Sequence, residues 1–145
     1  MIKKLIPYNE LGFKIILVNP PMLTLPNGTK IPAPNMKKLQ ITAFRALAEK
    51  PSRLTGDEVR FVRKYMQMTQ VDFSKWLNMS NHSVVSQWEA REEHLCGMDY
   101  NTDILLRLLM ETHLSKRSTF PINKIDKLRS LSFEEKILTL NLKAS

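Results

Sequence analysis

The sequence holds a single cysteine, Cys96, and three histidines. A lone thiol excludes an internal disulfide and any zinc site built on paired cysteines. His94, Cys96 and His113 are spaced too irregularly to suggest a metal site. We therefore expect no metal, no cofactor and a reducing compartment, the cytoplasm.

Glycine is also scarce, with four in 145 residues, and no glycine-rich phosphate loop is present. The chain shows no nucleophile elbow and no paired-carboxylate motif, and no carboxylate stands at a spacing that would orient a histidine. These absences predict that the protein is not an enzyme. No apolar run reaches the roughly 18 residues of a membrane span. The start MIKKLIPYNE lacks the apolar stretch of a signal peptide, so we expect none.

The chain does have ordinary apolar content and an excess of positive charge. Hydrophobic residues make up 43% and charged residues 25%, which suits one domain, or one domain with a small appendage. The net charge is +8. Residues 1–53 carry nine Lys/Arg and two Asp/Glu, residues 54–114 six and nine, and residues 115–145 seven and three. A basic protein is suspected of binding nucleic acid, but here the centre is mildly acidic and the flanks are basic.

Residues 1–53 predict short strands followed by one helix, a segment that we assign to dimerisation or partner binding. FKIILV at 13–18 is apolar and β-branched, and Asn27-Gly28 between apolar residues is typical of a two-residue β-hairpin turn. Several prolines keep these strands short or at a sheet edge. Asn35 is expected to cap a helix over 36–49. The inward face of this helix would consist of Met36, Leu39, Ala43 and Leu47.

Residues 54–114 predict a helical DNA-binding domain, and residues 115–145 a basic helical tail. Thr55 and Glu58 have the spacing of a capping box at the start of the first helix. Arg60, Arg63 and Lys64 are expected on the solvated side of that helix. The tail either packs as a last helix or stays mobile. Its clearest helical fragment has Ser132 as a cap before Phe133, Ile137 and Leu140.

The stretch MTQVDFSKWLNMSNHSVVSQWE at 68–89 holds both tryptophans. Thr69 is a good helix cap, and Asn78 tolerates the left-handed backbone of a sharp turn. A second helix is expected over 81–90, with Ser80 or Asn81 as its cap. At about 100° per residue, its inward side holds Val84, Val85 and Trp88. Trp88 is therefore predicted to be a core residue, and Trp76 a core or dimer contact.

The outward side of that second helix is polar and almost uncharged, which favours contact with DNA over plain solvation. It consists of His82, Ser83, Ser86, Gln87 and Ala90. Ser, Gln, Asn and His donate to and accept from base edges. The order helix, tight turn, helix is that of a helix-turn-helix, whose second helix enters the major groove. Whether Asn81 caps this helix or is its first reading residue stays open.

Residues 54–91 resemble the Xre/Cro-type helix-turn-helix of bacterial and phage repressors, in the style of the MqsA and HigA antitoxins. The resemblance rests on LTGDEVRFVRK at 54–64, MTQ at 68–70 and VSQWE at 85–89. It implies a mainly α fold, a five-helix Xre/Cro-like domain with a small N-terminal β-hairpin and helix segment. It also implies that Gln70 touches a phosphate or a base. The DNA-binding residues would be Thr69, Gln70, Lys75, Asn81, His82, Ser83, Ser86, Gln87 and Arg91.

Together these features predict a transcriptional regulator, expected to be a repressor, that binds a palindromic operator in double-stranded DNA as a homodimer. The basic flanks should supply phosphate contacts. The residues expected to do so are Lys37, Lys38, Arg45, Arg53, Lys116 and Arg117. The alternative is an antitoxin that binds a toxin protein through its N-terminal segment and autoregulates its operon. No membrane contact is expected.

Overall fold

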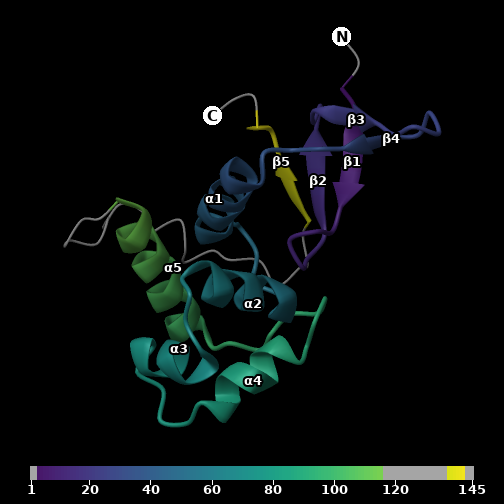
Figure 1. Cartoon of the computed structure of the whole chain (residues 1–145). Coiled ribbons are helices and arrows are strands. Elements are labelled where there is room, and N and C mark those ends of the chain that lie inside the picture. The colour runs from purple at the N-terminus through teal and green to yellow at the C-terminus, as the bar shows by residue number, and fades with distance from the viewer. Residues whose placement is uncertain (1–2, 116–136, 143–145) are drawn as a thin grey trace.

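The computed structural model describes residues 3–115 and 137–142, and Figure 1 shows a small region of β-structure joined to a group of helices. The sheet β1–β2–β5 and the hairpin β3–β4 lie at one end, and α3 and α4 lie at the other. The strands are β1 (Leu5–Tyr8), β2 (Ile15–Val18), β3 (Met22–Thr24), β4 (Lys30–Pro32) and β5 (Leu138–Leu140). The helices are α1 (Met36–Ala48), α2 (Gly56–Tyr65), α3 (Gln70–Trp76), α4 (Ser83–Glu89) and α5 (Tyr100–Ser115).

The expected mainly α, five-helix Xre/Cro-like fold is wrong. Within the described residues the chain forms five helices and five strands in two sheets, so the fold is α+β. The central strand of the larger sheet is β2, with β1 antiparallel on one side and β5 parallel on the other. Because β2 and β5 come from opposite ends of the chain, local sequence patterns do not report their pairing.

The C-terminal segment contributes a strand where a helical fragment was expected. Leu138–Leu140 forms β5, and Leu140 lies opposite Leu17 of β2. Leu140 is buried and Thr139 is exposed, which is the period-two alternation of a half-buried strand rather than a helical period. The rest of the expected fragment and two expected phosphate contacts lie outside the described residues. These are Ser132, Phe133, Lys116 and Arg117.

The hairpin expected around Asn27-Gly28 is present as β3–β4. Its loop is longer than the expected two-residue turn, since the Leu25 amide donates to the Thr29 carbonyl and three residues lie between them. Gly28, within this loop, takes a positive φ of 86°. Leu23 and Ile31 lie opposite one another across the hairpin and are 52% and 38% exposed. Neither β3 nor β4 pairs with the larger sheet, so this apolar pair is uncovered in the described part of the chain.

Helix α1 connects the sheet to the other helices. Asn35 caps it as expected, since its side chain accepts a hydrogen bond from the Lys38 amide at 3.1 Å. Leu39, Ala43 and Leu47 are fully buried where α1 packs against β5, α2 and α5. The placement of Met36 on this inward face was wrong, because Met36 begins the helix beyond the packed turns and is 41% exposed.

A buried ionic cluster joins the segment between α1 and α2 to α2 and α5. Lys50 Nζ donates to both carboxylate oxygens of Glu58, at 2.8 and 2.6 Å. Arg107 donates to Asp103 at 2.8 Å, and Arg53 donates to the other oxygen of Asp103 at 3.2 Å. Because a buried charge without its partner is strongly destabilising, these pairs hold the elements in register. Arg53 is therefore not the exposed phosphate contact that was expected.

Helix α2 begins with the expected capping box. Thr55 Oγ1 accepts from the Glu58 amide at 3.2 Å, and Glu58 Oε1 accepts from the Thr55 amide at 2.9 Å. Gly56 then allows a close approach of the chain that follows α4. A Cβ atom at this position would lie 2.4 Å from the Trp88 carbonyl oxygen and 2.7 Å from the Glu92 amide. The absence of a side chain at Gly56 thus lets α2 and the end of α4 meet backbone to backbone.

Candidate nucleic-acid interface

Helices α3 and α4 are joined by a sharp turn. Thr69 caps α3 as expected, since its hydroxyl accepts from the Asp72 amide at 3.1 Å. Asn78 takes the left-handed conformation, with φ of 57°, directly after the helix. The Met79 amide donates to the Ser74 carbonyl at 2.8 Å and closes this turn. The two helices and the turn form a helix-turn-helix arrangement supported by α2, which contacts α4.

Helix α4 begins two residues later than the 81–90 span expected from the sequence. Asn81 lies in the turn, where its side-chain oxygen accepts from the Ser83 amide at 2.9 Å. His82 stands at the cap position without a side-chain capping bond. Both side chains are exposed. The expected cap, Ser80 or Asn81, is therefore wrong, because His82 holds the cap position and Asn81 lies in the turn before it. That Asn81 reads a base stays a prediction.

The two tryptophans are packing residues. Trp88 is 5% exposed and joins Val85 in the core, as the helical phase predicted. Val84 is half-buried beside them. Trp76 is half-buried and packs against the core, with its ring centroid 5.9 Å from that of Phe73. The apolar side of α4 therefore points into the protein.

The opposite side of α4 is exposed and carries no charged side chain. Along the exposed side lie His82, Ser86, Gln87 and Ala90, and Ser83 is half-buried at its edge. These side chains are short or flexible and can donate and accept hydrogen bonds, apart from alanine. In Figure 1, α4 forms one end of the molecule and lies across α2 from α1. Because these side chains are exposed, a large ligand can contact them.

A buried carboxylate, that of Glu89, ties the inner side of α4 to α2 and α3. Arg63 donates to both of its oxygens, at 2.7 and 2.9 Å. Arg60 of α2 and Gln70 of α3 each donate to Oε1 at 3.3 Å. Burial acts to raise the pKa of the Glu89 carboxyl, but the hydrogen bonds and charge of Arg63, together with hydrogen bonds from Gln70 and Arg60, hold that pKa below its ordinary value.

This network changes the roles expected for several residues. Arg63 was expected on a solvated face, but its side chain is only 12% exposed and is bonded to Glu89. Gln70 is half-buried and its amide is also bonded to Glu89, so it links α3 to α4. Sequence reasoning missed Glu89. The available signal was an acid placed directly after the inward Trp88 and four residues after the inward Val85.

The remaining residues of the expected interface lie at the start of α3, near its end and directly after α4. Thr69 is exposed before α3, and Lys75 is exposed near the end of α3. Arg91 is exposed just after α4. The structure therefore leaves His82, Ser86 and Gln87 exposed at the start of α4 and along it, with one exposed cation on α3 and one directly after α4.

Comparison with protein-family models, with curated proteins and with solved structures finds no match for this chain. In residues 3–115 and 137–142, no group of three or more His, Cys, Asp or Glu side chains is arranged to hold a metal ion. None of the described helices is both long enough and apolar enough to cross a membrane.

Proposed function

We propose that this protein is a sequence-specific DNA-binding transcriptional regulator, and that α4 enters the major groove. The observation that carries the proposal is the uncharged polar side of α4, exposed on a helix whose other side is held by Trp88 and Glu89. A preorganised helix with small hydrogen-bonding side chains suits base-edge recognition. The resemblance of residues 54–91 to Xre/Cro-type regulators supports the same function. Such a regulator would act in the cytoplasm, and repression is the proposed direction.

In this proposal the residues divide into two groups by the part of DNA that they contact. Base edges are assigned to His82, Ser83, Ser86 and Gln87, with Asn81 at the entry to α4. Phosphates are assigned to Lys75 and Arg91, with Thr69 beside them. Gln70 acts through Glu89, because its amide is already bonded there. This assignment differs from the direct DNA contact that the sequence resemblance implied for Gln70.

Replacing His82 or Gln87 with alanine should weaken binding to the selected DNA site by about 1–3 kcal/mol, the free energy that one good pairing with a base edge supplies. Both side chains are exposed, so the folded state should keep its melting temperature. The site would first be selected from a random DNA library, and affinity would then be measured by fluorescence anisotropy. Gln40→Ala, on the exposed side of α1, is the matched control. Unchanged affinity in both α4 variants would contradict the proposed reading surface.

Phosphate contacts should come from the borders of α4 rather than from α1. Lys37, Lys38 and Arg45 are exposed, but α1 lies across α2 from α4 in Figure 1. We expect Lys75→Ala and Arg91→Ala each to reduce the slope of log affinity against log salt by about one. Replacing the three cations of α1 together should leave that slope nearly unchanged. If the α1 variant reduces the salt slope and Lys75→Ala and Arg91→Ala do not, the phosphate contacts belong to the N-terminal part, as the sequence alone predicted.

The regulator is proposed to bind DNA as a homodimer. Two-fold symmetry would place two copies of α4 about 34 Å apart, on half-sites one helical turn apart. Selected DNA should therefore contain an inverted repeat. Sedimentation of the complex should give two protein chains for each such site, and a single chain on a site without a repeat would contradict the dimer.

An antitoxin function is the second candidate, and the uncovered apolar pair of the β3–β4 hairpin favours it. Leu23 and Ile31 face solvent in the described structure, as residues of a protein contact would in the free protein. The test is copurification with the product of the adjacent gene, for the wild type and for a variant with both residues changed to lysine. Copurification with the wild type that is lost in the doubly substituted variant would support the antitoxin function. Its absence for the wild type would count against it.

A further inference from the structure

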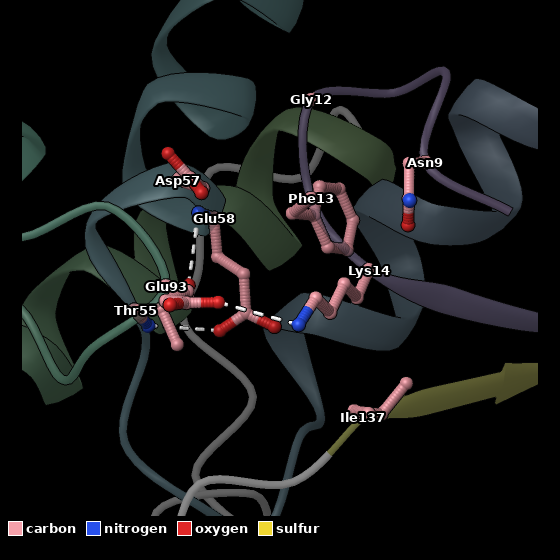
Figure 2. Close-up of a pocket in the computed structure, with 9 residues that line it drawn as sticks. All are labelled: Asn9, Gly12, Phe13, Lys14, Thr55, Asp57, Glu58, Glu93 and Ile137. Atoms are coloured by element: carbon pink, nitrogen blue, oxygen red, sulfur yellow. Dashed lines mark hydrogen bonds and ion pairs between the residues drawn. The ribbon is translucent and has the colours of Figure 1, made fainter. Parts of the chain in front are cut away.

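A pocket of about 410 Å³ lies where the sheet meets the helices (Figure 2), and the residues that line it do not come from α4. Its walls come from the turn between β1 and β2, the start of α2, the loop after α4 and the start of β5. Its size lies within the usual range for small-molecule sites, about 300–1,000 Å³. Junctions between parts of a protein are common places for such sites.

The two sides of this pocket differ in chemistry. Figure 2 shows Asp57, Glu58 and Glu93 on one side, and Phe13 and Ile137 on the other. Ile137 is 52% exposed, so apolar surface remains uncovered in the pocket. A ligand that fits both sides would combine an apolar body with positive charge.

The carboxylate of Asp57 is poorly compensated. Among the described residues its ion-pair partner is Arg60, at 3.8 Å, and Arg60 lies closer to Glu89, at 3.3 Å. Burial, with Glu92 and Glu93 nearby, raises the pKa of the Asp57 carboxyl against the opposing effect of Arg60. A cation in the pocket would therefore be stabilised more by the Asp57 carboxylate than by that of Glu58. The Glu58 oxygens are already bonded to Lys50 and Thr55.

The rim of the pocket already holds an alkylammonium group of the protein. Lys14 Nζ lies 3.3 Å from Glu93 Oε2, and both side chains are largely exposed. An exposed ion pair of this kind contributes little stability, so another ammonium group can replace Lys14 at small cost. The Lys14 side chain thus shows that the Glu93 carboxylate can pair with an alkylammonium group.

We propose that this pocket binds a short aliphatic diamine, with one ammonium group at Asp57 and the other at Glu93 in place of Lys14. The methylene chain lies between them against Phe13 and Ile137. Two carboxylates on one side of the pocket match the two ammonium groups, and the apolar side chains opposite them match the methylenes. This site is independent of the proposed DNA surface, and its test needs no DNA.

The experiment is titration of the full chain with cadaverine, followed by calorimetry and by NMR shifts of residues around the pocket. We expect saturable binding that shifts the amide signals of Gly12, Asp57 and Glu93. Asp57→Asn and Glu93→Gln should each weaken binding about tenfold, the effect of removing one charge-assisted hydrogen bond. Lys14→Ala should strengthen it, because the competing ammonium group is removed. General destabilisation would weaken binding in every variant. Stronger binding by Lys14→Ala together with weaker binding by Glu93→Gln would therefore not result from it.

Matched controls separate the pocket from general charge effects. Glu10→Gln and Lys4→Ala remove exposed charges that do not line the pocket, so both should leave cadaverine affinity unchanged. Pentanoate, with the opposite charge, should not bind. Absence of saturable binding to the wild type, or equal affinity for the wild type and for both acid variants, would overturn the proposal. Since Glu93 is exposed, its variant keeps the test valid even if Asp57→Asn unfolds.

Discussion

A Trp88→Ala variant should unfold with a free energy about 3–5 kcal/mol below that of the wild type. The indole is 5% exposed and lies with Val85 in the core, so truncation creates a cavity as well as reducing apolar burial. The backbone at Trp88 also lies against Gly56, which limits how far α4 can move to fill that cavity. Urea unfolding followed by far-ultraviolet circular dichroism measures the change in stability.

Two other variants serve as controls for Trp88→Ala. Trp76→Ala removes a half-buried ring and should destabilise the fold less than Trp88→Ala. His82→Ala should leave stability unchanged while it weakens DNA binding. A Trp88→Ala protein that keeps its unfolding midpoint but no longer binds DNA would mean that Trp88 contacts DNA and that the inward and outward sides of α4 are reversed.

Replacing Glu89 with alanine should cost about 3–5 kcal/mol of stability, as expected when one partner of a buried ion pair is removed. Glu89 is 2% exposed in its side chain and receives two bonds from Arg63. Without it, the Arg63 guanidinium is left largely buried without its carboxylate. Thermal and urea unfolding should both report the decrease. Because Glu89 joins α2, α3 and α4, DNA affinity should fall in the same variant at temperatures where it is still folded.

The control for Glu89→Ala is a variant in which both Arg63 and Glu89 are replaced. Changing Arg63 and Glu89 together to methionine removes both charges and keeps apolar volume, so the double variant should be more stable than Glu89→Ala. Glu93→Ala removes an exposed acid four residues later and should change stability little. If Glu89→Ala is no less stable than Glu93→Ala, the network does not hold the helices together.

Glu89 also predicts a dependence of stability on pH. Its pKa is lower in the folded protein than its ordinary value of 4.5, so the folded state favours the ionised carboxylate. This contribution is fully present above the ordinary pKa and is lost as pH falls through the lowered pKa of the folded state. Stability of the wild type should therefore drop more steeply below pH 4.5 than that of Glu89→Gln. Parallel curves for the two proteins would contradict the pKa shift.

The sequence alone determined the features that depend on neighbours along the chain. Asn35, Thr55 and Thr69 cap helices as predicted, because a cap bonds to an amide three residues away. Trp88 is inside for an equally local reason, since the helical period places it beside Val84 and Val85. These local signals also defined the surface proposed to read DNA, apart from the boundary at Asn81.

The tertiary structure alone decided the features that join distant segments. The α+β fold depends on β5 pairing with β2, and the role of Glu89 depends on Arg63 of another helix. Arg53 changed from an expected DNA contact to a partner of Asp103, fifty residues away. A carboxylate or guanidinium has the same local pattern whether it faces solvent or a buried partner. Its environment is set by which elements pack together, and that long-range packing determines which charges remain for a ligand.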